Sequence, residues 1–390
     1  MNEPRITVPD VEYNALKQAE PGLPMRWYHD PEQYQLELAQ IWQKSWLYVC
    51  RASDLAEALA YRTFEIGNQN IVILRDADGI LRAFHNACRH RGSILCTEDA
   101  GKLKTKLLTC PYHQWSYSCD DGRLVRISSF AEPDGFSKAD YGLFPVALHE
   151  WRGCIFIHLD NDAQFDERQV FGRPTSLLAN WPLEQMVEGD SWTHVIDCNW
   201  KTWWENFGEC LHCPGVHPEL VELVPLYGRR IISPMDLPDW TEHEHDDDPK
   251  YKGGLREGGE TWSTDGSAQG HVIPSLTGED LARGQTYCTA LPSVFMVGYA
   301  DHFRIVRVRP MGPEKTELSV GWYFLPETLN AVDYDKTNVT DFARLVIGQD
   351  ADACALNQKG LHAAPLERGV LMPEEWVLKL FHDWVRKHLD

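Results

Sequence analysis

The sequence is short of positive charge: 37 lysine and arginine residues face 58 aspartate and glutamate residues, a formal net charge of −21. A nucleic-acid-binding protein needs basic side chains to neutralise phosphates, so this balance argues against DNA or RNA as a partner. Long hydrophobic runs are also absent, and the strongest one, GCIFIHL at 153–159, is far too short to cross a bilayer. We therefore expect a soluble protein without nucleic-acid or membrane partners, and the charge suits docking to a basic protein face.

Signals for secretion are missing as well. Residues 1–17 lack the apolar segment of a signal peptide. The 11 cysteines are odd in number and scattered, unlike the disulfide framework of a small secreted domain. We expect a cytoplasmic protein whose thiols stay reduced, some of them as metal ligands. A chain of 390 residues with 43% hydrophobic residues fits two domains, or one large enzyme with an inserted module.

Periodicity predicts both helices and strands. The helices are expected at 32–47, 199–212 (with Asp197 or Asn199 as N-cap), 336–359 and 373–389. Short alternating segments between 61 and 159, and again at 303–310 and 316–324, are typical of strands. The polar, glycine-rich composition of residues 241–260 predicts a mobile loop. The HEHDDD run at 243–248 offers metal-ligand side chains, but a solvated loop is the better interpretation.

Two Cys/His pairs form the first metal-ligand pattern. Cys88-x-His90 is followed, after 19 residues, by Cys110-x2-His113. A structural zinc site with two thiolates and two imidazoles is one interpretation, and four unrelated residues is another. A zinc finger usually places its two histidines together, whereas here each loop supplies one sulfur and one nitrogen. That arrangement favours a [2Fe–2S] cluster with both cysteines on one iron and both histidines on the other.

His212 and His217 form the second pattern. On a continuous helix they would point about 140° apart, but we expect Pro214 and Gly215 to end the helix between them and bring His217 back. Two histidines and a carboxylate from elsewhere make the facial triad of a non-haem Fe(II) site, with positions left open for oxygen and substrate. By itself the H-x4-H spacing is also common among surface and core histidines.

Together these segments resemble a known family. CRHRG at 88–92 with CPYHQWSY at 110–117 resembles the Rieske motif of oxygenases, and NWK…EN…E-x-x-H-x4-H resembles their catalytic domain. The resemblance covers about residues 25–388 and implies an α+β fold. We expect an N-terminal segment (1–45) packing with the catalytic domain, an all-β Rieske [2Fe–2S] domain (46–160), and a helix-grip-type catalytic domain (161–390) with an antiparallel sheet flanked by helices. Cys96 and Cys119 would then remain free thiols.

The resemblance also implies site residues. The cluster ligands are Cys88, His90, Cys110 and His113, and the iron ligands are His212, His217 and an aspartate in a segment ending C-x3-Q-x-G. Counting back four residues from Cys354 favours Asp350; Asp352, about 200° away on a helix, is the rival.

Other residues of the catalytic segment have implied roles. Glu209, three residues before His212, matches an acid that bridges to a cluster histidine of a neighbouring subunit, and we expect it on one helical face with Glu205 and His212. Asn206 matches the family's asparagine beside that acid. Trp203 and Phe207 are interpreted as core packing. Two positions depart from the family pattern. Leu211 replaces a tyrosine that often precedes the first histidine, and Ala355 replaces an acid that often follows the late cysteine. Neither is a metal ligand, so these departures bear on substrate geometry.

The resemblance finally implies an activity. The chain would be the terminal oxygenase of a homotrimer that uses O2, with each cluster serving the neighbour's iron. Electrons would come from NAD(P)H through a separate flavin/iron–sulfur reductase, because no GxGxxG follows a strand. The spacing ENFGECLHC resembles the choline and glycine betaine monooxygenase branch, which hydroxylates or N-demethylates small quaternary-ammonium compounds.

Three other functions stay open. The first is a ring-hydroxylating or O-demethylating oxygenase that acts on aromatic acids and includes dioxygenases. A Rieske electron carrier and a zinc-stabilised binding protein are the others, and the candidate ligands His212, His217 and Asp350 argue against both.

Overall fold

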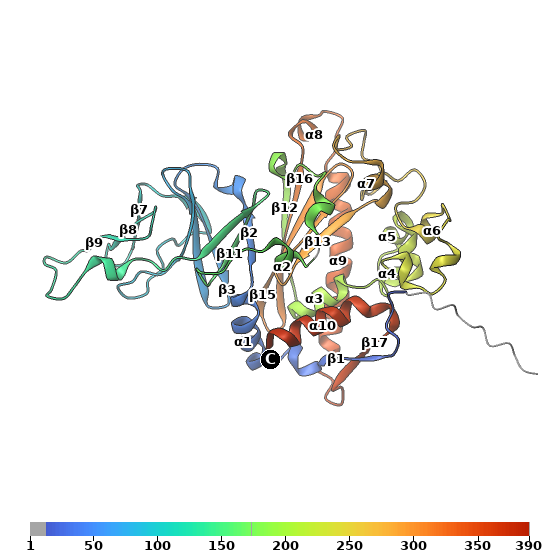
Figure 1. The fold of residues 1–390 in the computed structure, drawn as a ribbon, viewed down its shortest axis with the longest axis horizontal. Helices are drawn as coiled ribbons and strands as arrows, with labels where there is room; N and C mark the ends of the chain where they lie inside the picture. The colour runs from blue at the N-terminus through green and yellow to red at the C-terminus, as the bar shows by residue number, and fades with distance from the viewer. Residues whose placement is uncertain (1–12, 173, 390) are drawn as a thin grey trace, which may run out of the picture.

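The computed structural model describes residues 13–172 and 174–389. The first twelve residues, which include most of the segment considered for a signal peptide, lie outside the described residues. Figure 1 shows a strand-rich extension on one side and a body of helices and sheet on the other. This is the α+β arrangement that the sequence predicts.

The extension is built from three antiparallel sheets. Its strands are β2 (Leu47–Arg51), β3 (Ala60–Ile66), β4 (Gln69–Arg75), β5 (Leu81–His85), β6 (Ala100–Lys102), β7 (Leu107–Thr109), β8 (Ser116–Ser118), β9 (Leu124–Arg126), β10 (Ala147–Trp151) and β11 (Cys154–His158). The strand orders are β10-β11-β2, β5-β4-β3-β6 and β7-β8-β9. The four consecutive residues 71–74 of β4 are completely buried, because this strand lies between β3 and β5 with both faces covered. The small sheet β7-β8-β9 forms the far end of the extension (Figure 1).

The body is organised around a five-stranded antiparallel sheet of order β12-β16-β15-β14-β13. Its strands are β12 (Val187–Ile196), β13 (Thr286–Ala290), β14 (Val294–Gly298), β15 (Phe303–Gly312) and β16 (Lys315–Phe324), while β1 (Glu20–Pro24) and β17 (Arg368–Leu371) pair separately. The helices are α1 (Pro31–Gln40), α2 (Glu167–Phe171), α3 (Trp200–Phe207), α4 (Cys213–Val216), α5 (Pro218–Leu223), α6 (Pro249–Lys252), α7 (Gly278–Arg283), α8 (Pro326–Asn330), α9 (Thr337–Gly360) and α10 (Trp376–Leu389).

Helix α9 is the longest element and positions part of the site. Its apolar residues Val339, Ala343, Val346 and Ile347 recur at helical spacing and are buried in the main core, together with Trp322 of β16. Helix α3 contacts both α9 and the sheet. The site residues of both helices are therefore carried on rigid, packed elements.

The N-terminal segment is tied to the body by a buried ion pair. Lys201 of α3 and Glu37 of α1 are both 0% exposed, with Nζ 2.7 Å from Oε1. The Trp200 indole donates to the other carboxylate oxygen of Glu37 at 2.8 Å. Buried charges are stable only when paired and hydrogen-bonded, so this contact fixes α1 against α3.

Some predicted elements differ from the observed ones. The helix expected at 32–47 ends at Gln40; a short 3-10 helix (Trp42–Lys44) follows, and β2 begins at Leu47. The strands at 303–310 and 316–324 are confirmed, as is the helix at 336–359. The segment 241–260 contains α6, and its His243 pairs with Asp239 and Asp246.

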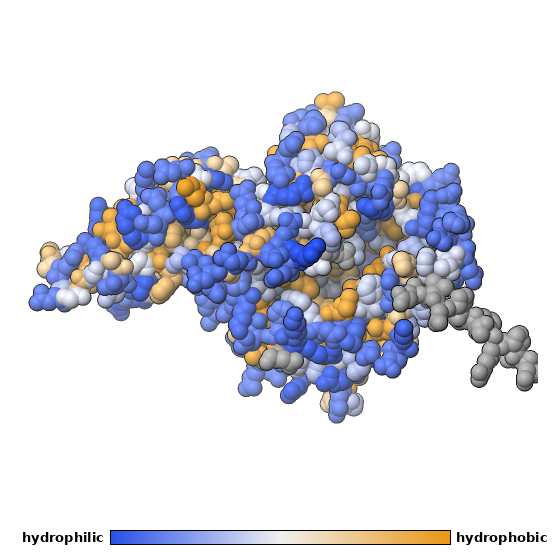
Figure 2. Space-filling model, in the orientation of Figure 1, coloured by the Kyte–Doolittle hydropathy of each residue, from blue (hydrophilic) through white to orange (hydrophobic). Residues whose placement is uncertain are grey.

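The surface is mainly hydrophilic in the view of Figure 2, with hydrophobic side chains showing along the extension and around the hollowed centre of the body. No helix in the described part of the chain is both long and apolar enough to span a membrane.

Candidate active site

The segment that carries the two histidines is broken into short helices. Asn199 caps α3 by accepting a hydrogen bond from the Lys201 backbone N–H at 3.0 Å, so Asn199 and not Asp197 is the N-cap. Helix α3 ends at Phe207, and the chain turns at Gly208 before α4 and α5. The prediction of one helix over 199–212 is therefore wrong at its C-terminal end.

The role expected for Pro214 and Gly215 also differs. Both lie inside α4, where proline occupies one of the first helical positions, which needs no backbone N–H partner. The change of direction falls instead at His217, whose backbone is not helical (φ −125°, ψ 66°) and separates α4 from α5. Consecutive short helices, and not a single broken one, bring the two histidines together.

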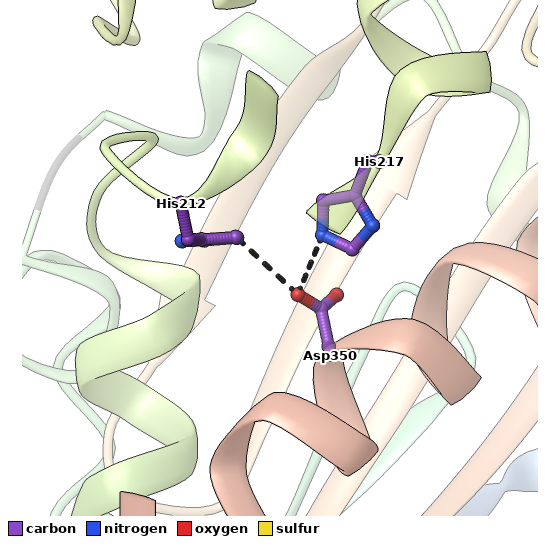
Figure 3. Close-up of side chains that lie close together, drawn as sticks. All are labelled: His212, His217 and Asp350. Carbon is purple, nitrogen blue, oxygen red and sulfur yellow. Dashed lines mark hydrogen bonds and ion pairs between the residues drawn. The ribbon is translucent and has the colours of Figure 1, made fainter. Parts of the chain in front are cut away.

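His212, His217 and Asp350 converge from two separate parts of the chain (Figure 3). The Oδ1 atom of Asp350, on α9, lies 2.8 Å from Nε2 of His217 and 3.3 Å from Nε2 of His212. The three candidate ligand atoms all lie within 4.8 Å of one another. Ligands on one face of an octahedral ion, each about 2.1 Å from the metal, are separated by about 3 Å. The residues therefore fit a single metal ion.

A neighbouring side chain orients each histidine. Glu209 Oε1 lies 2.6 Å from Nδ1 of His212, and Gln349 Oε1 lies 2.8 Å from Nδ1 of His217. Such contacts fix the imidazole so that its other nitrogen faces the metal position. Asn206 donates to the same Oδ1 of Asp350 at 2.6 Å. Gln349 immediately precedes Asp350 and was missed by sequence reasoning, because an amide beside a ligand has no distinctive spacing.

The charges of His212 and Asp350 stabilise each other. Burial alone would lower the pKa of His212, but its hydrogen bonds with Asp350 and Glu209 raise it to about 9. Burial would raise the pKa of Asp350, yet the bonds to His212 and His217 hold it below its ordinary value. Asp350 is therefore a charged carboxylate in a nearly enclosed place, as a cation-binding group requires.

Two acidic residues lie elsewhere than expected. Asp352 is exposed on α9 and does not join the group. Glu205 does not share a helical face with Glu209 and His212, because α3 ends between them. Its Oε1 instead accepts hydrogen bonds from Tyr28 at 2.5 Å and from His382 at 2.8 Å, which ties both ends of the chain to α3.

Trp203 and Phe207 have the packing roles predicted for them. Trp203 is 2% exposed, and Phe207 stacks on Phe295 with ring centroids 4.2 Å apart.

The two Cys/His pairs lie in adjoining loops at the far end of the extension. Cys88 and Cys110 are 3% and 1% exposed, whereas the His90 ring is exposed and lies 4.8 Å from the His113 ring. The thiol pair is thus inside, His90 is at the surface and His113 beside it is half-buried. Nδ1 of His113 is buried without a hydrogen-bond partner among the described residues, as expected for a metal ligand.

The polar surroundings of the thiols suit a cluster. Burial would raise the pKa of Cys110, but the backbone N–H groups of His113 and Tyr112 lower it overall. The Tyr117 hydroxyl lies 3.1 Å from Cys88 Sγ. Hydrogen bonds to the sulfur atoms of an iron–sulfur cluster raise the reduction potential of the cluster. Cys96 and Cys119, expected to be free, are free and buried.

The two candidate centres of one chain lie far from each other. The loops next to β7 and β8 form one end of the molecule in Figure 1, while α4 and the neighbouring part of α9 belong to the body on the other side. A single chain therefore offers no short path between them.

Cys210 and Cys213, on either side of Leu211 and His212, form a disulfide. Sequence reasoning did not anticipate it. The available signal was the C-x2-C spacing within ECLHC.

Comparison with known families identifies the chain. Residues 183–390, more than half of the sequence, match the family model described as the ring-hydroxylating alpha subunit (catalytic domain). The chain belongs to this family. Residues 45–137 match the Rieske [2Fe–2S] domain. The protein is therefore a Rieske-type oxygenase, an oxidoreductase whose two domains imply a [2Fe–2S] cluster and a non-haem iron.

Several relatives of this oxygenase are similar over most or half of the chain. The glycine betaine monooxygenase oxygenase subunit of Chromohalobacter salexigens is 29% identical and covers 95% of this chain and 86% of its own. The carnitine monooxygenase oxygenase subunit of Escherichia coli K12 is 36% identical over 50% of this chain and 52% of its own. A solved quaternary ammonium Rieske monooxygenase, described with insights into carnitine oxidation and inter-subunit electron transfer, has a TM-score of 0.71 at 20% identity and covers 95% and 96% of the two chains.

Proposed function

We propose that this oxygenase is the terminal component of a monooxygenase that hydroxylates, and thereby N-demethylates, a small quaternary-ammonium or betaine-like compound. The observation that carries the proposal is the convergence of His212, His217 and Asp350 on one metal position. The relatives that act on glycine betaine and carnitine support the substrate class.

In this proposal the cluster is held by Cys88, His90, Cys110 and His113, and the mononuclear iron by His212, His217 and Asp350. Iron held by three protein ligands keeps open positions and supplies the oxidising chemistry with O2. The protein provides the placement. Glu209 and Gln349 hold the imidazoles with Nε2 toward the metal, and Asn206 holds the carboxylate.

Electrons would reach the site from a second copy of the chain. The imidazole pair His90 and His113 lies at the far end of the extension, away from its own chain's iron ligands. We propose a homotrimer in which this end docks beside Glu209 of the neighbour, and Glu209 joins the two imidazole systems. NAD(P)H would supply the electrons through a separate reductase, which docks on the acidic protein by a basic face.

The proposed reaction balances with two electrons. A methyl group of R–N⁺(CH3)3, one O2, two electrons and two protons give the N-hydroxymethyl cation and one water. The hydroxymethyl compound then loses formaldehyde and a proton to leave the dimethylamine. No acid–base pair of the protein is required for the second step.

The proposed cation pocket is an aromatic group that includes Phe342 of α9. The Trp262 ring lies 5.5 Å from Tyr299, 6.3 Å from Tyr227 and 6.3 Å from Phe342, between ring centroids. Phe342 is two turns, about 12 Å, before Asp350 on α9. Aromatic faces attract quaternary ammonium groups. Trp262 Nε1 and the Tyr299 hydroxyl are buried and have no hydrogen-bond partner among the described residues, so they are available for a substrate carboxylate.

The test is oxygen consumption by anaerobically reconstituted enzyme with a reductase. One substrate panel contains glycine betaine, choline and carnitine, and the other contains benzoates and phenolic acids. We expect formaldehyde or an aldehyde from the first panel in proportion to O2 consumed, and much weaker turnover by Trp262→Ala. Hydroxylated, demethylated or dihydrodiol products from the second panel alone would overturn the substrate class and favour an aromatic-acid oxygenase.

A further inference from the structure

We propose that Cys210 and Cys213 are a reversible thiol–disulfide pair that controls how firmly the mononuclear iron is held. This inference rests on the metal site of the proposed function and adds its regulation. Nothing in the oxygenase reaction itself requires a disulfide at this place.

The disulfide encloses a metal ligand. It closes a ring of four residues, 210–213, and His212 is a member of that ring. The Cys213 backbone N–H also donates to the Cys210 carbonyl at 3.1 Å, so the ring is a turn leading into α4. The backbone of the ligand is thus constrained on both sides by one covalent bond.

The acid that orients His212 is connected to this ring. Glu209, which contacts Nδ1 of His212, directly precedes Cys210. Its other carboxylate oxygen accepts the backbone N–H groups of Leu211 and His212 within the ring. A change in the ring therefore moves the ligand and its orienting acid together.

The sulfur also lies close to the metal position. Cys213 Sγ is 3.9 Å from Nε2 of His212, the same nitrogen that faces Asp350. Cys210 and Cys213 are 4% and 3% exposed. A peroxide released at the metal position would form close to this pair, because Cys213 lies next to the ligand nitrogen.

The pair can cycle between two states with balanced chemistry. One thiolate attacks hydrogen peroxide to give a sulfenic acid, and the second thiol displaces water from it to form the disulfide. The sum is two thiols and one H2O2 giving one disulfide and two waters. A dithiol reductant returns the two electrons and two protons by thiol–disulfide exchange. In a reducing compartment the reduced form is the resting state, and oxidation is a response to peroxide.

Ring closure restricts the ligand when the metal is absent. The loop-entropy relation for closing four residues of an unfolded chain corresponds to about a 20-fold change in an equilibrium constant, which is the upper limit for a turn that stays folded. The reduced turn keeps its hydrogen bonds but gains backbone freedom. We therefore expect iron to be released more slowly from the disulfide form than from the dithiol form.

The experiment uses the enzyme loaded with cluster and iron. One sample is reduced with dithiothreitol and desalted under argon; parallel samples are oxidised with diamide or with one equivalent of hydrogen peroxide. Alkylation followed by mass spectrometry shows whether Cys210 and Cys213 are free thiols, which are alkylated, or are protected by the disulfide. Iron release to a chromophoric Fe(II) chelator is followed while the visible absorption of the cluster is monitored, so that cluster iron is not counted.

We expect about 5- to 20-fold slower release from the oxidised sample. Cys210→Ser and Cys213→Ser should release iron at the reduced rate under both conditions, and the matched control Cys50→Ser, on β2, should behave like the parent. The comparison of the two states of the unmutated protein does not depend on how well any variant folds. Full alkylation of both cysteines after oxidation, or equal release rates in the two states, would overturn the proposal.

The outcome is separable from that of the substrate proposal. Redox-dependent iron release without turnover of any quaternary amine would overturn only the substrate class. Absence of mononuclear iron in both redox states would overturn the metal assignment and this inference with it.

Discussion

Removal of the hydrogen bond between Gln349 and His217 tests the metal site most directly. Gln349→Leu keeps the size of the side chain on α9 but removes the oxygen that lies 2.8 Å from His217 Nδ1. His217 is 1% exposed, so water cannot easily replace the lost acceptor. The imidazole then has a buried, unsatisfied N–H and a less defined ring orientation.

The expected magnitude follows from that buried group. An unsatisfied buried donor costs about 1–3 kcal/mol, and loss of a partner behind a metal ligand typically weakens binding about 10- to 100-fold. The two ranges agree, because each 1.4 kcal/mol is about tenfold. We expect the Kd of Fe(II) to rise by about 10- to 100-fold in Gln349→Leu.

The measurement is an anaerobic Fe(II) titration by competition with a chromophoric chelator. Glu219→Gln is a graded variant: Glu219 accepts the Gln349 amide at 3.1 Å, and an amide oxygen can still accept that bond, so a smaller effect is expected. Asp352→Asn, on the exposed side of the same helix, is the matched control. A Kd for Gln349→Leu within twofold of the parent value would refute the reasoning.

Three further predictions concern the ligand, the bridge and the core. Asp350→Ala should empty the mononuclear site by metal analysis while the cluster spectrum persists, and Asp352→Ala should not; the reverse result would transfer the ligand role. Glu209→Gln should retain both metals and slow single-turnover product formation about 10- to 100-fold, and an unchanged rate would refute the bridge. Lys201→Met should lower the free energy of unfolding, measured in urea, by about 3–5 kcal/mol, because Glu37 is 0% exposed and loses its counter-charge. The double variant Lys201→Met/Glu37→Gln has no unpaired charge and should lose less. An equal loss of stability in the single and double variants would contradict this explanation.

Much of the fold was accessible from the sequence because it depends on local pattern. The alternation at 303–310 and 316–324 and the helical periodicity before Asp350 arise from one buried face per element, and that periodicity does not depend on the partner. Element ends were less accessible. Helix α1 ends at Gln40, and the strand that begins at Leu47 is set by pairing with β11, more than a hundred residues away.

The sequence by itself determined the segments that carry the chemistry. Cys88-x-His90, Cys110-x2-His113 and His212-x4-His217 are short enough that any fold keeps each pair close. Tertiary structure decided which distant residues join these segments. It places Asp350, and not Asp352, beside the two histidines, and Gln349 against His217. It also turns Glu205 toward Tyr28 and His382. These contacts join residues more than a hundred positions apart, and only the packing of α9 and the chain ends around α3 brings them together.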